Sequence, residues 1–166
     1  MAAGSTYEPI ATTTATGSTS TITFNSFTGY TDLVLVFEGN STNAGSSANS
    51  LRVRVNSDTG SNYSVTYISG DGSSASSGRT SNQTNWDGMN IAQASVRGMV
   101  NMYFMNYSNS TTYKTMLNRS SVAAVDSLTA VNLWRNTNAI TAIEVYISTG
   151  NFSSGSTFTL YGIAAA

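Results

Sequence analysis

The chain has no cysteine and no histidine among its 166 residues, and each absence removes a group of functions. Without cysteine there is no disulfide and no thiol nucleophile. Without histidine the chain lacks the most frequent general base and the most frequent ligand of transition metals. A Ser-His-Asp triad and a zinc site made of cysteine and histidine are therefore excluded.

Charge is also scarce. Charged residues make up 9% of the chain, Lys114 is the only lysine, and the net charge is −1. A net charge near zero gives no general attraction to nucleic acid or to an anionic membrane. The N-terminal stretch lacks the basic and apolar regions of a secretory signal, and no apolar run approaches the ~18 residues of a membrane span. We therefore expect a protein made in a cytoplasm, with no nucleic-acid or membrane partner.

What the chain does contain favours β-structure. It has 24 Thr, 27 Ser and 17 Asn, while hydrophobic residues make up 40% of the sequence, which argues against disorder. Threonine suits strands, whereas serine, asparagine and glycine suit turns. The length suits one domain.

The order of apolar residues predicts strands. The segment "SLRVRVN" (50–56) alternates, with Leu51, Val53 and Val55 on one face. The segment "TDLVLVFEG" (31–39) is continuously apolar, as a strand buried on both faces would be. The best helical candidate, residues 89–96, is short.

We therefore predict an all-β fold of eight to ten strands in an antiparallel two-sheet β-sandwich, jelly-roll-like. An immunoglobulin-like sandwich is the alternative, although such domains usually have about 100 residues. One domain would span residues 1–166, with a short N-terminal arm (1–10) and a long Gly/Ser loop (70–85) that a partner orders.

Chemistry could come only from the eight carboxylates. A glycosidase needs two of them facing a sugar, but no acid lies in a run that indicates a cleft. The segments "GDG" (70–72) and "WDG" (86–88) are similar to pieces of calcium loops, yet two acids are too few for the six or more oxygen ligands of calcium. We expect Asp-Gly turns there, no cofactor, no metal and no enzymatic activity.

Several residues are candidates for contacts with a partner. Trp86 either anchors its loop or lies at an interface, and with Tyr63 or Tyr67 it could form a glycan site. Arg52 and Arg54 share one strand face, which is either solvated or bound to a partner. The run 99–107, rich in Met and Tyr, predicts one core face and one subunit contact. The expected interface residues are Tyr7, Ile10, Arg52, Arg54, Arg79, Trp86, Met102 and Phe104.

Three segments also resemble a known family. They are "YTDLVLVFEG" (30–39), "LRVRVNSDTGSNYSVTYISGDGSSASSGR" (51–79) and "FTLYGIAAA" (158–166). They are similar to small jelly-roll structural proteins of tailed bacteriophages, particularly those of cyanobacteria and marine hosts. The "DTGSNYS" turn and the "LYGI" end carry the resemblance most sharply.

The resemblance implies a virion component. Such domains act as capsid cement or decoration proteins, often homotrimers, which sit on the outer capsid surface between subunits of the major capsid protein. Related jelly rolls occur in tail fibres and baseplates, so a carbohydrate- or receptor-binding domain is the alternative. A fibre protein usually also needs an attachment segment such as a coiled coil, and this chain has no heptads.

Overall fold

A computed structural model describes residues 6–43, 49–93, 96–123 and 125–164, and these residues form strands, turns and loops without a helix. No membrane-spanning helix is therefore found among them. The strands are β1 Tyr7–Thr14, β2 Thr21–Asn25, β3 Asp32–Ser41, β4 Asn49–Val55, β5 Tyr63–Gly70, β6 Ala75–Gln83, β7 Asn90–Gln93, β8 Gly98–Met105, β9 Lys114–Val122, β10 Asp126–Trp134, β11 Ala142–Ile147 and β12 Thr157–Ile163.

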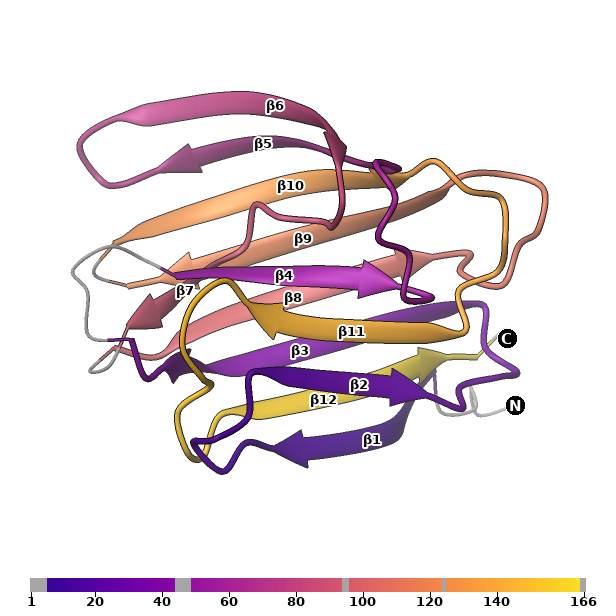
Figure 1. The fold of residues 1–166 in the computed structure, drawn as a ribbon, viewed down its shortest axis with the longest axis horizontal. Coiled ribbons are helices and arrows are strands. Elements are labelled where there is room, and N and C mark those ends of the chain that lie inside the picture. The colour runs from indigo at the N-terminus through magenta and orange to yellow at the C-terminus, as the bar shows by residue number, and fades with distance from the viewer. Residues whose placement is uncertain (1–5, 44–48, 94–95, 124, 165–166) are drawn as a thin grey trace.

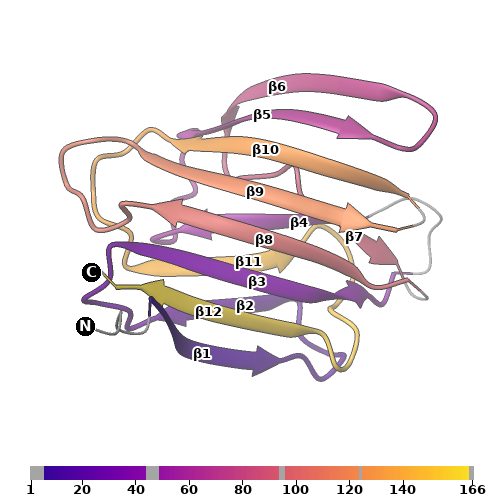
Figure 2. The same cartoon turned by 180° about the vertical axis from the view of Figure 1, so that it is seen from behind.

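The strands form two sheets packed face to face. Eight of them pair in the order β1-β12-β3-β8-β9-β10-β5-β6, and the other four pair in the order β2-β11-β4-β7. The four-stranded sheet lies in front in Figure 1, and the eight-stranded sheet lies in front in Figure 2. Both are antiparallel, apart from a two-residue parallel contact between β7 and β3 that links them at one end. The predicted all-β, two-sheet sandwich is confirmed.

The core lies between the sheets and follows the alternation of the sequence. Leu51, Val53 and Val55 of β4 are fully buried, as the pattern predicts. Phe37 and Phe158 of the eight-stranded sheet meet at a ring-centroid distance of 4.9 Å, deep in this core. Each such side chain contributes about 1.5–3 kcal/mol when it is removed from water.

Strand β3 is buried on its core face, but its outer face is buried only in part, so the burial on both faces that its continuous apolar run predicts holds at Val34 and not at Val36 or Glu38. Leu33 and Leu35 point into the core, whereas Val34 points to the outer face and is still only 4% exposed. Its neighbours explain this burial, because Val34 lies opposite Tyr161 of β12 and opposite Tyr103 of β8. Two tyrosines therefore flank a valine on the outside of the sheet.

The prediction of a long Gly/Ser loop at 70–85 is wrong over most of that range. Residues 75–83 form β6, which pairs with β5 in a hairpin at the edge of the larger sheet. The chain turns at Asp71, whose carboxylate accepts the backbone N–H groups of Ser73 and Ser74, and these bonds hold the pKa of that carboxyl well below its usual range. The hairpin extends beyond the smaller sheet, so β6 needs no apolar face.

The expected N-terminal arm and the helical candidate at 89–96 are both strands over much of their length. Residues 7–10 belong to β1, which pairs along β12, so this part of the expected arm is an edge strand. Residues 1–5 of that arm lie outside the described residues. The helical candidate at 89–96 is wrong because residues 90–93 form β7, held by β4 on one side and β3 on the other; residues 94–95 are not described. These short or polar strands raise the number above the expected eight to ten.

Lys114, the only lysine, is 1% exposed. Its Nζ donates to the carbonyl oxygens of Thr112 (2.7 Å) and Thr137 (2.9 Å), and burial lowers the pKa of this amine. We therefore expect an amine-acylating reagent to leave Lys114 of the native protein unmodified. Mass spectrometry should find acylated Lys114 only after denaturation.

The matched control is Arg119→Lys, which places an amine on an exposed position of the same strand. This variant should be acylated at residue 119 without denaturant. Acylation of Lys114 in the native protein at a rate like that of Lys at 119 would contradict the buried position.

Candidate interaction surfaces

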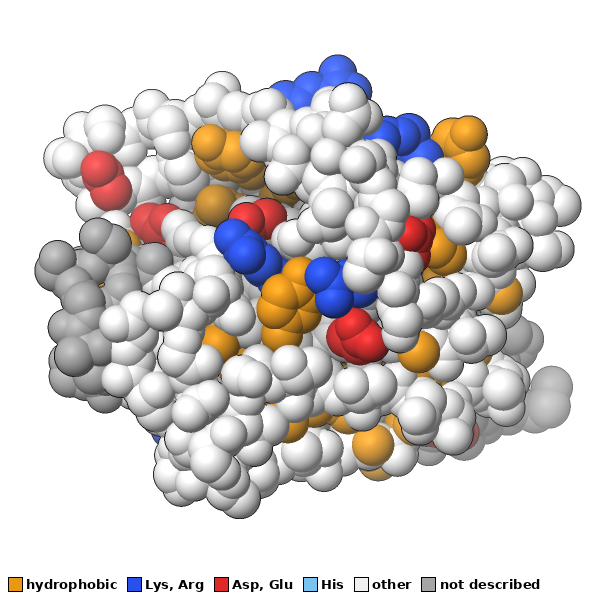
Figure 3. Space-filling model, in the orientation of Figure 1, with side chains coloured by type: hydrophobic (Ala, Val, Ile, Leu, Met, Phe, Trp, Pro, Cys, Tyr) orange, Lys and Arg blue, Asp and Glu red, His pale blue; other side chains and the backbone are white. Residues whose placement is uncertain are grey.

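The outer face of the four-stranded sheet carries a cluster of charged side chains. Lys/Arg and Asp/Glu side chains gather near the middle of this face in Figure 3. Arg52 pairs with Asp87 (3.5 Å between Nε and Oδ2), and Arg54 pairs with Glu144 (3.6 Å between Nη1 and Oε2). The charges are therefore balanced within the chain.

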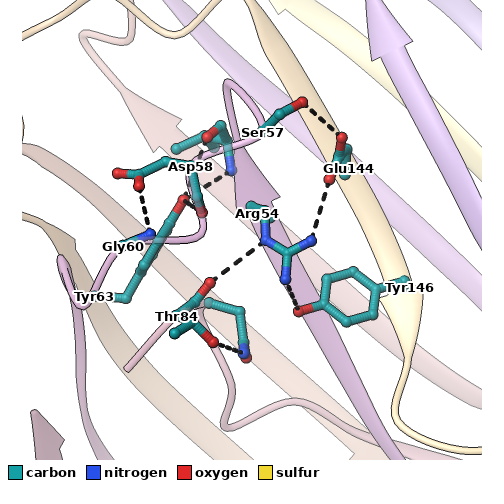
Figure 4. A network of polar contacts seen from close by, with 10 residues as sticks. Arg54, Ser57, Asp58, Gly60, Tyr63, Thr84, Glu144 and Tyr146 are labelled. Carbon is teal, nitrogen blue, oxygen red and sulfur yellow. Dashed lines mark hydrogen bonds and ion pairs between the residues drawn. The ribbon is translucent and has the colours of Figure 1, made fainter. Parts of the chain in front are cut away.

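Arg54 is the centre of this cluster. Its Nη2 donates to the Tyr146 hydroxyl at 3.2 Å, and its guanidinium carbon lies 5.0 Å from the centroid of that ring. Its Nε donates to the carbonyl oxygen of Thr84 (Figure 4). Ser57 in turn donates to the Glu144 carboxylate at 2.9 Å. Because the charged side chains of this cluster pair with one another, this face has little unpaired charge with which to attract another protein.

Asp58 lies beside this cluster and holds the turn between β4 and β5. Its carboxylate accepts the indole N–H of Trp134 at 2.7 Å, the side-chain amide of Asn62 at 2.8 Å and the backbone N–H of Gly60 at 2.7 Å. Its backbone carbonyl accepts the Tyr63 hydroxyl. This segment of the sequence, "DTGSNY", therefore has a structural role that connects the turn to two buried aromatic rings.

Trp86 is fully buried, which corrects its assignment to an interface. Its backbone pairs with Val53 of β4 through two hydrogen bonds, and this pairing turns the indole into the core. The ring packs edge-on against Tyr63 at 5.7 Å and lies 6.0 Å from Phe104. Tyr63 is also fully buried, so the expected glycan platform of Trp86 and Tyr63 does not exist.

Met102 and Phe104 also lie in the core at 0% exposure, which corrects their assignment as interface residues. Strand β8 alternates, and its even-numbered residues point inward. The outward side chains of this strand include Met99 and Met105, which are about half exposed at 48% and 51%. The expected division into a core face and an outward face holds, but the outward residues are different ones.

The outer face of the eight-stranded sheet concentrates the exposed apolar side chains. The described part of the chain has eight large hydrophobic residues that are exposed, and strand alternation places six of them on this face. They are Tyr7, Ile68, Met99, Met105, Leu117 and Val131. Tyr7 packs edge-on against Tyr161 on that side, and Arg79 lies at its far edge on β6. Ile10 is half-buried against the core, and Arg52 and Arg54 belong to the opposite face.

A groove of about 340 Å³ lies under the β5–β6 hairpin, where the larger sheet extends past the smaller one. Tyr67, Gln83, Asp87 and Asn90 line it, together with serine and threonine hydroxyls. Many of these groups bond within the chain: the Asn90 amide donates to Asp126 at 2.5 Å, and Asp87 pairs with Arg52. Polar and apolar side chains both line the groove, and few of its donors and acceptors are uncommitted.

Among the described residues, no three acidic side chains come close enough together to hold a metal ion. No family model, no curated protein and no solved structure matches the chain.

Proposed function

We propose that this chain is a structural protein of a tailed-phage virion, a decoration protein that binds the outer surface of the capsid and stabilises it. The asymmetry between its two sheet faces carries the proposal. One outer face has charges that are balanced internally, and the other collects six of the eight exposed large hydrophobic residues. Concentration of apolar side chains on one face is typical of a protein-binding surface.

The winding of the chain supports the same proposal. The pairs β1-β12-β3-β8 form one run and the pairs β2-β11-β4-β7 form the other, with the β5–β6 and β9–β10 hairpins added at one edge. We infer that this is a jelly roll, because the chain passes between the sheets and returns its last strands beside its first. Jelly rolls recur in viral capsid proteins and in lectins.

The mechanism would be passive. A protein that binds only the assembled shell stabilises that shell by mass action, since the bound copies must leave before the subunits separate. A homotrimer would combine three weak contacts through effective concentration. Such a role needs a rigid sandwich and a contact surface, and it needs no cofactor and no catalytic residue.

The test is co-sedimentation with capsids of the source phage that have been stripped of this protein, with tail-only particles as the control. We expect saturable binding in a fixed ratio to the major capsid protein, and a higher melting temperature of the loaded capsids. Binding to tails alone, or to neither particle, would contradict a decoration role.

Carbohydrate or receptor binding on a tail fibre or baseplate is the second candidate, and the groove under the β5–β6 hairpin favours it. Tyr67 offers an aromatic ring there, and Gln83 and Thr80 offer polar groups. If this function is right, a glycan array should identify a ligand whose binding Gln83→Ala weakens. Ser57→Ala, which changes a side chain outside the groove, should leave that binding unchanged.

A further inference from the structure

We infer that the partner docks across the strands of the eight-stranded sheet, on an apolar row flanked by two arginines, and presents an apolar strip with carboxylates beside it. This inference rests on the proposed function and names the surface that faces the shell. The row consists of side chains on five adjacent strands, Tyr161, Val34, Tyr103, Leu117 and Val131, and is called the cross-strand row below.

Strand register places these residues side by side. Tyr161 lies opposite Val34, which lies opposite Tyr103, and Tyr103 lies opposite Leu117 of β9. Leu117 in turn lies opposite Val131 of β10. Because neighbouring strands are about 4.8 Å apart, the row runs for roughly 19 Å across the sheet.

Exposure increases from Val34 to Val131. Val34 is enclosed between its tyrosines, whereas Leu117 is 38% exposed and Val131 is 49% exposed. Met105 lies two residues from Tyr103 on the same side of β8 and is also exposed. Apolar side chains that are this exposed and in register gain stability only when another apolar surface covers them.

Two arginines give the surface its charge. Arg79 of β6 continues the row, because it lies opposite Thr66, which lies opposite Val131. Arg119 lies on the same side of β9 as Leu117, two residues away. Neither guanidinium pairs with a carboxylate in the part of the chain that the structure describes.

The acidic groups on this side are already engaged. Glu38 pairs with Arg97, and the Asp32 carboxylate accepts the backbone N–H of Asn106. If a second copy of this chain lay on this face, its arginines would therefore meet no uncommitted carboxylate among the described residues of the face. Charge complementarity favours a different protein, whose apolar strip has carboxylates beside it.

The face is large enough for a specific contact. Its shortest strand has seven residues. Eight strands about 4.8 Å apart, with a rise of ~3.3 Å per residue, cover roughly 800 Å². A standard protein–protein interface buries about 800 Å² on each partner. The charged four-stranded face would then point away from the shell.

The experiment compares three variants in the capsid co-sedimentation assay, at low and at high salt. The double variant Leu117→Thr/Val131→Thr places β-branched residues, which suit strands, on two exposed positions, and we expect it to weaken binding about 10-fold or more. Arg119→Ala should weaken binding by about 3- to 10-fold at low salt and by less at high salt. Thr21→Glu changes the net charge by the same amount as Arg119→Ala, but at an exposed position on the outer face of the four-stranded sheet. It should change binding less than about 2-fold. Near-UV circular dichroism and melting temperature establish that each variant is folded.

The outcomes separate the inference from the proposed function. If the wild-type protein does not bind capsids, the proposed function fails and the inference fails with it. If it binds, and both the double variant and Arg119→Ala bind as well as Thr21→Glu does, the proposed function stands and the assigned docking face is wrong. If the free protein is a dimer in analytical ultracentrifugation and the double variant is a monomer, a second copy covers the row, which overturns the assignment to a different protein.

Discussion

Replacing Trp86 with alanine should lower the free energy of unfolding by about 3–5 kcal/mol, the usual cost of truncating a buried aromatic side chain. The indole is fully buried between Tyr63 and Phe104, and the surrounding strands are fixed by their sheet pairing, so the cavity cannot easily collapse. Urea denaturation followed by far-UV circular dichroism measures the change. A loss below about 1 kcal/mol would mean that Trp86 is not in the core.

A conservative variant separates packing from hydrogen bonding at this position. The indole Nε1 of Trp86 is buried and has no hydrogen-bond partner among the described residues. Trp86→Phe therefore loses ring volume but no polar contact, and it should cost clearly less than Trp86→Ala. Met99→Ala, on a side chain that is 48% exposed, should change stability by no more than about 0.5 kcal/mol.

The second large effect concerns Asp58. Burial raises the pKa of this carboxyl, but the hydrogen bonds from Trp134, Asn62 and Gly60 outweigh burial and leave the pKa below its usual value. The native protein therefore binds fewer protons here than the unfolded chain. The resulting stability is complete above the unfolded pKa of about 3.9 and is lost as the pH falls through the lower native pKa.

We expect Asp58→Asn to destabilise the protein at pH 7 by about 1.5–3 kcal/mol, the range for hydrogen bonds to a charged group. The difference from the wild type should begin to shrink as the pH falls below about 4, because the unfolded wild-type chain then takes up a proton at Asp58, and it should be lost once the pH falls through the lower native pKa. Urea titrations of both proteins from pH 7 to pH 3 measure it. A difference that is constant over this range would show that the charge of Asp58 does not matter.

The two tryptophans give a matched comparison. Trp134 and Trp86 are both buried, but only Trp134 donates its indole N–H to a carboxylate, at 2.7 Å from Asp58. Trp134→Phe should therefore cost more than Trp86→Phe by about 1.5–3 kcal/mol. Equal costs would show that the hydrogen bond to Asp58 adds nothing to stability.

Strands with a buried face could be predicted from the sequence, whereas the polar strand β6 could not. Residues 50–56 alternate between apolar and polar because one side of β4 lies in the core, so this alternation predicts the strand. Strand β6 has the sequence "ASSGRTSNQ" and no core face, so its composition is that of a loop. Its conformation depends on pairing with β5, a partner that no local pattern identifies.

The interface residues show a similar limit. Sequence patterns correctly separate two faces of β8, but the period alone does not say which face is the core, and Met102 and Phe104, expected at an interface, lie in the core. Trp86 follows a polar segment, and its burial depends on backbone bonds to Val53, which lies 33 positions earlier in the chain. The cross-strand row joins five strands and exists only once their register is set.

The position of β12 has a consequence for how the protein is made. This strand lies between β1 and β3, so the earliest and latest segments of the chain are neighbours in one sheet. During synthesis, the ribosome delivers β1 and β3 long before the strand that joins them. Both must wait with unpaired edges until translation has passed residue 163, and folding that depends on such distant pairing is slow. The nascent chain therefore has a long interval in which its exposed strand edges are open to chaperones.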